Sequence, residues 1–165
     1  MSERGDNGLT LGECSLNVSK DSPFVEAVGA IDEFQARLGS ARVLLKKNEN
    51  DSILNIENDL TEVMSTLYQG IKWQNGEKRV EEINSEIEFC KGRVESLDKF
   101  LVPGENEIES RLNLCRTGCR TAERRVVTLK LDREEKEDLD FDENILKYFN
   151  KLSTYLYWMW RSKLN

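Results

Sequence analysis

The chain contains no histidine, and this absence limits the chemistry that it can perform. Histidine is the usual base for serine and cysteine nucleophiles, the commonest general acid–base and a frequent metal ligand. Di-iron sites in helical bundles also depend on it, because they are built from Glu-x-x-His pairs. Any reaction of this protein must therefore proceed without an imidazole.

Proline and long apolar runs are also scarce. Only two of the 165 residues are proline, and no apolar run approaches the roughly 18 residues of a membrane-spanning helix. Residues 1–6 lack the apolar core of a secretory signal. With 33% charged and 38% hydrophobic residues, the chain is typical of a single helical domain, residues 1–165, which we expect to be cytoplasmic and to bind no membrane.

Charge and cysteine content exclude further classes. The net charge of −7 argues against nucleic-acid binding, because phosphate contacts demand an excess of Lys and Arg. The four cysteines include no C-x-x-C pair. Cys90, Cys115 and Cys119 occupy apolar positions of apparent helices, where a thiol serves as a small hydrophobic group. We therefore expect no resident metal site.

Apolar residues recur every three or four positions, which predicts an all-α fold of five helices in an antiparallel bundle. Ser22 and Pro23 are a favourable N-cap and first residue for the first helix. Pro103 and Gly104 are expected to end the third. The apolar positions span residues 24–45, 53–67, 80–101, 112–129 and 144–159, with residues 50–52 preceding the second helix and an acidic linker, residues 132–138, preceding the fifth.

Residues 1–21 differ from the bundle at residues 22–165, since glycine and small polar residues replace the apolar pattern. Such a segment is either a flexible tail or a loop whose backbone N–H groups and hydroxyls wrap a phosphate. It is not a Walker A motif, because G-K-S/T is missing.

Residues 116–125, with the sequence RTGCRTAERR, concentrate arginine in an otherwise acidic protein. On a helix that turns about 100° per residue, Arg116, Arg120 and Arg124 lie along one side, with Glu123 in the same band. The apolar series of this segment lies on a different side, so the segment is a core helix with a cationic flank. The flank is either an anion-binding face or a solvated charged face.

Several blocks fit the pattern of one protein family. Residues 4–11 resemble T/R-G-D-x-G-x-T-x-L, with Leu11 one position before the final leucine of the pattern, and residues 20–33 fit K-D-S-P-x-V-E-A-x-G-x-x-D-E. Residues 100–104 fit F-x-x-P-G, residues 116–124 fit R-T-x-x-R-R-A-E-R with one change, and residues 148–157 fit Y-x-N-R-L-S-D-x-L-F with a few. In this order, over nearly the whole chain, the blocks resemble the trimeric, helical-bundle ATP:cob(I)alamin adenosyltransferases of propanediol use and mitochondrial cobalamin processing.

The resemblance implies transfer of the 5′-deoxyadenosyl group of ATP to the cobalt of a reduced corrinoid, cob(I)alamin or cob(I)yrinic acid a,c-diamide, with release of triphosphate. Co(I) is itself the nucleophile, so the reaction suits a protein without histidine. The protein must supply positioning and positive charge, which Arg and Lys retain at working pH. The implied ligands are ATP, Mg²⁺ and cobalamin as a substrate, and the implied partners are further copies in a homotrimer and a flavin-type reductase.

The resemblance also assigns roles by matching position. Residues expected around the nucleotide and its Mg²⁺-bound phosphates are Arg4, Gly5, Asp6, Gly8, Thr10, Lys20, Arg124 and Asn150. Arg120 and Glu123 would be catalytic groups at the ATP site, and Phe100 would crowd the lower face of the corrin and favour a four-coordinate cobalt. Asp32 and Arg116 would pair between subunits, which places each active site at a trimer interface. The alternatives are an exposed charge for Asp32, backbone satisfaction for Asn150 and ordinary core for Phe100.

Four positions depart from the family pattern. Thr121 and Lys151 each replace an arginine, Thr154 replaces an aspartate that many members have, and Glu105 replaces a glycine. Lysine is a less rigid cation than arginine, and Glu105 adds negative charge near the expected corrin site. The rival interpretation is therefore a non-catalytic nucleotide-binding or interaction bundle of the same fold.

Overall fold

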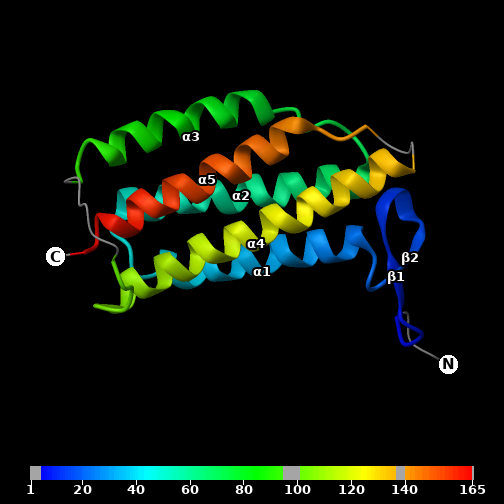
Figure 1. Ribbon diagram of the computed structural model, residues 1–165, viewed down its shortest axis with the longest axis horizontal. Helices are drawn as coiled ribbons and strands as arrows, with labels where there is room; N and C mark the ends of the chain where they lie inside the picture. The colour runs from blue at the N-terminus through cyan, green and yellow to red at the C-terminus, as the bar shows by residue number, and fades with distance from the viewer. Residues whose placement is uncertain (1–4, 95–100, 137–139, 165) are drawn as a thin grey trace.

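The computed structural model describes residues 5–94, 101–136 and 140–164, in which five helices form a bundle preceded by a two-stranded sheet (Figure 1). This confirms the predicted all-α, five-helix fold. None of the described helices carries an apolar stretch long enough to cross a bilayer. The helices are α1 (Pro23–Arg42), α2 (Lys47–Gln69), α3 (Gly76–Lys91), α4 (Glu107–Glu135) and α5 (Glu143–Arg161), and the sheet pairs β1 (Leu9–Leu11) with β2 (Asn17–Ser19) around a 3₁₀ turn, η1 (Glu13–Ser15).

Each helix runs antiparallel to the helix before it in the chain (Figure 1). α4 packs against both α1 and α5, α2 packs on α1, and α3 packs on α5. Because one antiparallel helix separates α3 from α5 in the chain, these two packed helices run in the same direction. α4 is thus the helix that joins the two halves of the bundle.

The apolar stripes predicted from the sequence form the core. Burying one such side chain fully contributes about 1.5–3 kcal/mol. Members with no exposed area are Ile31, Phe34 and Leu38 of α1, Ile53, Leu60 and Val63 of α2, Leu112, Cys115, Cys119, Ala122 and Val126 of α4, and Phe149, Leu152 and Leu156 of α5.

Side-chain caps define where three helices begin. The Ser22 hydroxyl accepts a hydrogen bond from Val25 N at 3.4 Å, with Pro23 in the first turn of α1, as the sequence predicts. Asn106 caps α4 through Glu109 N at 2.9 Å, and Asp142 caps α5 through Asn144 N at 2.9 Å.

The acidic linker predicted over residues 132–138 is wrong in its first half, because α4 continues to Glu135. Ion pairs along the helix compensate the charges: Lys136 pairs with Asp132 at 2.7 Å, and Lys130 pairs with Glu134 at 3.5 Å. Arg133 is buried in the same turn. A highly charged run therefore stays helical where its charges have partners.

The predicted limits of α2 and α3 also need correction. α2 begins at Lys47, so residues 50–52 lie inside the helix; the Asn50 side chain donates to Arg42 O at 2.9 Å and ties this first turn to the end of α1. α3 ends at Lys91, capped by Gly92, whereas its apolar pattern continues to Leu101. Leu101 lies in irregular structure and is half-buried against the core. The apolar pattern therefore overestimates the length of the helix.

The N-terminal segment, predicted as a loop, is a β-hairpin. Thr10 of β1 pairs with Val18 of β2, and Gly12 N donates to Leu16 O at 2.7 Å across the tip. Cys14 and Ser15 take positive φ values of 49° and 64° to make this tight reversal. Each strand has only three residues, which is too short for its apolar pattern to be recognised in a glycine-rich sequence.

A buried polar network joins α2, α3 and α5. Arg79 donates to both carboxylate oxygens of Asp59 at 2.6–2.9 Å, and the Tyr148 hydroxyl donates to Asp59 at 2.5 Å. Burial raises the pKa of Asp59, and the hydrogen bonds from Arg79 and Tyr148 oppose that rise. Burial also raises the pKa of Tyr148 well above its ordinary value, so the phenol keeps its proton and remains a donor.

Replacing Tyr148 with Phe should lower the free energy of unfolding by about 1–3 kcal/mol, because the buried Asp59 carboxylate loses a donor. Urea unfolding followed by circular dichroism measures the change. Tyr68→Phe is the matched control, since the Tyr68 ring is 39% exposed, and it should change stability by less than about 0.5 kcal/mol. A Tyr148→Phe protein as stable as the parent would show that Arg79 alone satisfies Asp59.

Candidate functional site

The arginine flank of α4 points away from the core, as predicted. Arg120 and Arg124 are exposed and Arg116 is half-buried, while the apolar series between them is buried. Arg120 Nη1 pairs with Glu123 Oε2 at 3.2 Å. The helix period alone thus places Glu123 beside a cation on this face.

The other two arginines of the flank bond to neutral side chains. Arg116 donates to Asn113 Oδ1 from Nε and Nη2, at 3.1 and 3.0 Å. Arg124 Nη2 donates to Thr121 Oγ1 at 3.1 Å, and Thr121 in turn donates to Thr117 O at 3.2 Å. Within the described part of the chain, neither guanidinium group has an ion-pair partner. The face can accept an anion without first breaking an ion pair at either residue.

The hairpin brings three of the predicted nucleotide residues together. Lys20 Nζ donates to Gly5 O at 2.8 Å, and Lys20 N donates to Gly8 O at 2.9 Å. Gly5 and Gly8 have φ values of 105° and 78°, which strain any residue with a Cβ. The result is a turn with an ammonium group at its edge. Asp6 is exposed, Thr10 is half-buried, and Arg4 lies outside the described residues.

Asn150 lies on α5 at the level of the arginine flank. Cys119 Sγ of α4 contacts Phe149 O of α5 at 3.4 Å, so Arg120 and Asn150, each one residue further along its helix, lie within about one helical turn of each other along the bundle. Asn150 is exposed, and its carbonyl accepts from the Thr154 hydroxyl at 3.3 Å. Thr154, a departure from the family pattern, therefore bonds to its own helix.

Asp32 and Arg116 do not meet within one chain. Asp32 is exposed on α1, and the Arg116 bonds found among the described residues go to Asn113. By contrast, the neighbouring Glu33 pairs with Arg37 at 2.5 Å on the same helix. A pair between Asp32 and Arg116 would need a second subunit.

Arg116 also lines a cavity of about 280 Å³ beside the start of α4. Its walls combine aliphatic, aromatic and polar groups, namely Leu101, Pro103, Asn113, Tyr157, Trp160 and Arg161. Leu101 and Pro103 follow Phe100, which itself lies outside the described residues. The cavity therefore adjoins the segment where the resemblance places the corrin.

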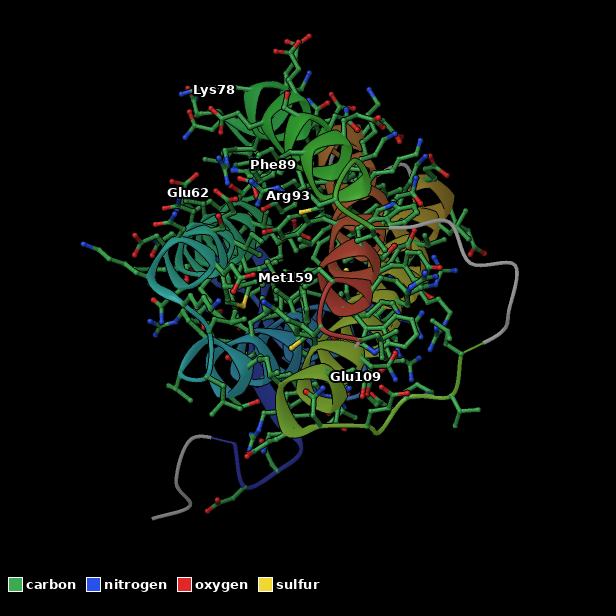
Figure 2. The ribbon with its side chains drawn as sticks, turned by 90° about the vertical axis from the view of Figure 1, so that its left-hand side faces the viewer. Glu62, Lys78, Phe89, Arg93, Glu109 and Met159 are labelled. Atoms are coloured by element: carbon green, nitrogen blue, oxygen red, sulfur yellow. The ribbon has the colours of Figure 1, made fainter. Side chains whose placement is uncertain are left out.

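Glu109 holds the segment before α4, and the sequence reasoning did not single it out. Its carboxylate, with no exposed area, accepts from Gly104 N at 2.7 Å, from Glu105 N at 3.1 Å and from Trp160 Nε1 (Figure 2). Asn106 followed three residues later by Glu109 is a capping-box pattern, and this signal was available in the sequence. Here the glutamate binds the preceding loop and α5.

A second cavity, of about 600 Å³, lies between α2, α3 and α5. Phe89 of α3, Arg93 just after that helix and Met159 of α5 lie around it (Figure 2), with the Arg93 guanidinium 3.9 Å above the Phe89 ring. None of the predicted site residues lines it. A site chosen by cavity volume alone would therefore not include the arginine face.

The protein is a five-helix bundle with a glycine- and lysine-containing hairpin at one end. A cationic face runs along its central helix. The sequence profile of the family described as Cobalamin adenosyltransferase matches residues 1–163, and the chain is a member of that family.

Particular relatives agree with this assignment. The corrinoid adenosyltransferase PduO of Citrobacter freundii is 32% identical over 96% of this chain, which spans only 48% of that protein. The corrinoid adenosyltransferase of Bacillus subtilis is 30% identical over 93% of this chain and 80% of its own length. The chain therefore spans about half the length of the PduO relative and most of the Bacillus one.

Solved structures share the fold. A variant of the PduO-type ATP:corrinoid adenosyltransferase from Lactobacillus reuteri, complexed with cobalamin and ATP, matches with a TM-score of 0.85 at 22% identity, over 98% of this chain and 89% of that one. Another variant of that protein, complexed with ATP, matches with a TM-score of 0.84 at 23% identity, over 98% and 91%.

The two cysteines of α4 are buried and do not belong to its arginine face. Burial raises the pKa of Cys115 to about 12 and that of Cys119 well above its ordinary value. Both side chains belong to the core, as predicted, whereas Cys14 is exposed.

Iodoacetamide at about pH 8 should therefore modify Cys14 rapidly and leave Cys115 and Cys119 unmodified until the protein is denatured. Only about one Cys115 thiol in ten thousand is ionised at that pH, and the thiolate is the reactive form. Peptide mass spectrometry of native and urea-treated samples measures the difference. Rapid native labelling of Cys119 would contradict its place in the core.

Proposed function

We propose that this protein transfers the 5′-deoxyadenosyl group of ATP to the cobalt of a reduced corrinoid, releasing triphosphate. The observation that carries the proposal is the arginine face of α4, where Arg116 and Arg124 bond only neutral groups among the described residues. The names of the relatives and the ATP and cobalamin bound in the fold neighbour support the same reaction. In this step the Co(I) electron pair forms the Co–C5′ bond, and the C5′–O bond breaks toward the triphosphate.

The residues of this chain would contribute charge and position. Arg120 and Arg124 would neutralise the triphosphate as it leaves, where fixed cations stabilise the transition state most. Glu123, paired with Arg120, would hold that guanidinium in place. Lys20 and the backbone of the Gly5–Gly8 turn would bind phosphate oxygens, with Asn150 completing the site from α5.

Mg²⁺ would enter with the nucleotide. The described residues contain no group of three or more Cys, Asp or Glu side chains arranged to hold a metal ion. The phosphate oxygens of ATP, with one or two protein groups such as the exposed Asp6, are the oxygen ligands that Mg²⁺ prefers. We infer that the ion arrives as part of Mg-ATP.

The corrin would lie beside the cavity that Tyr157, Trp160 and Arg116 line. Aromatic walls suit a large, mainly apolar macrocycle. Phe100, just before the Leu101 wall, would then exclude a lower ligand from the cobalt, as the resemblance implies. A four-coordinate cobalt is easier to reduce to Co(I), and an electron donor such as a flavin-type reductase would complete the system.

A homotrimer would complete each site. Asp32 is exposed and Arg116 has only a neutral partner in the described part of one chain, so a neighbouring subunit can supply the opposite charge to both. Four free cysteines and two intracellular substrates favour a cytoplasmic protein.

The second candidate is a nucleotide-binding bundle that does not adenosylate corrinoids. Thr121 favours it, because its hydroxyl bonds to Arg124 where the family pattern has another arginine. Reduced cobalamin with Mg-ATP, followed by the spectral change on Co–C bond formation, separates the two. A folded protein that binds ATP and yields no adenosylcobalamin would establish the second.

Arg120→Ala should reduce turnover by roughly 100-fold, the cost of removing one strong donor from a developing anion. Because Arg120 is exposed, the helical content should not change. The matched control is Arg125→Ala, since Arg125 pairs with Glu26 of α1 at 3.4 Å and should leave turnover within about threefold. Equal turnover in both variants would remove Arg120 from the site.

Asp32→Asn should shift the assembly toward smaller species or raise the KM for ATP, because Arg116 of the adjoining subunit would lose its partner. Analytical ultracentrifugation over a range of concentrations, with kinetics on the same samples, measures both effects. Glu33→Gln is the control, as Glu33 pairs with Arg37 in its own helix. An Asp32→Asn protein that matches this control in mass and kinetics contradicts the intersubunit role.

A further inference from the structure

The tip of the N-terminal hairpin is tied to the far end of α4 by an ion pair. Arg133 Nη2 donates to Glu13 Oε1, although 120 residues separate the two in the chain. Arg133 is 5% exposed, which is unusual for an arginine, and Glu13 is half-buried. Arg133 belongs to the part of α4 that the sequence indicated as a linker.

The surroundings make this pair difficult to replace. The Arg133 guanidinium lies 5.6 Å from the centre of the Phe141 ring, and its Nε has no hydrogen-bond partner among the described residues. The Glu13 carboxylate therefore supplies the negative charge next to a guanidinium that water scarcely reaches. Removing the Glu13 carboxylate takes this negative charge away from a buried guanidinium, which is far more costly than losing an exposed pair.

The hairpin has other contacts with the bundle, because η1 also packs on α2. Leu9, Leu11 and Leu16 are all exposed, so the leucines of the hairpin are not part of the core. Beside the ion pair, the tip has a long contact from Cys14 Sγ to Gln69 O, at 3.7 Å. At its other end the hairpin continues directly into Ser22, the cap of α1.

The hairpin connects this tip to the predicted nucleotide turn. Figure 1 shows the hairpin beside the end of the bundle, with its tip at the C-terminal end of α4. From the tip, the pairs Thr10 with Val18 and Leu9 with Ser19 lead to the Lys20 bonds with Gly5 and Gly8. Because the paired strands move as one unit, a shift of the tip displaces the turn.

We propose that Arg133 is a positioning residue for the ATP site: by binding Glu13 it fixes the hairpin, and thereby holds Lys20 and the Gly5–Gly8 turn where the triphosphate binds. The proposal rests on the proposed adenosyltransferase function. Arg133 touches no substrate in this scheme, and α4 thus supplies both the arginine face and the anchor of the hairpin that carries Lys20.

The test compares Arg133→Met, which keeps the apolar stem and removes the charge, with the parent protein. Amide exchange at Gly12, Leu16 and Lys20 should become at least tenfold faster, because their hydrogen bonds lie within the hairpin. The KM for ATP should rise about tenfold while kcat stays within twofold. Arg133→Lys should recover part of both effects, since it restores the charge without the guanidinium fork.

Two further variants keep the result interpretable. Glu13→Gln changes a half-buried residue and should reproduce the effects if Arg133→Met folds poorly; the double variant should be no worse than either single one, because the two residues act as a unit. Lys163→Met is the control, as it breaks a partly buried pair with Glu49, 2.5 Å long, just after the end of α5, which lies at the opposite end of the bundle from the hairpin (Figure 1). It should leave hairpin exchange and the KM for ATP unchanged.

Each remaining outcome is decisive. Three results would overturn the positioning role: faster exchange with an unchanged KM for ATP, unchanged exchange, or an equal effect of Lys163→Met. In each case, ATP binding by the parent protein would leave the proposed function standing. A parent protein that shows no heat of binding with Mg-ATP by calorimetry would overturn the proposed function, and the positioning role with it.

Discussion

The close packing of α4 between α1 and α5 is the constraint on which the rest of the structure depends. The apolar residues that recur at helical spacing from Leu112 to Val126 are fully buried, so the opposite side of the helix must point to solvent. Gly118 permits the approach to α1, since a Cβ there would lie 3.0 Å from Arg37 Cδ and 3.5 Å from the Phe34 ring. The orientation of Arg116, Arg120 and Arg124 therefore follows from the core.

One helix consequently organises the whole candidate site. Along α4, Glu109 binds the loop that precedes it, the arginine flank offers positive charge at its middle, and Arg133 holds the hairpin near its end. A cationic surface with no histidine suits a reaction whose nucleophile is a metal and whose leaving group is an anion. What such a protein must provide is fixed charge and fixed distance.

The departures from the family pattern have local explanations of unequal weight. Thr121 replaces a cation of the family pattern, but its hydroxyl accepts a hydrogen bond from Arg124 and donates to its own helix. It therefore helps to orient the Arg124 guanidinium. Thr154 bonds to Asn150 O and leaves the Asn150 side chain exposed. Glu105 donates its backbone N–H to Glu109, a contact that any residue at that position could make. Nothing in the structure explains Lys151.

The sequence by itself determined the five helices, their buried faces and the cationic flank, because helical periodicity sorts side chains by face without reference to any neighbour. It also located the glycine turn, since a backbone with positive φ favours glycine. Only the tertiary structure decided where α3 ends, that α4 runs through a charged stretch, and that residues 9–19 form a hairpin. Those features depend on contacts between distant segments, such as Glu13 with Arg133, and no local pattern encodes such a pair.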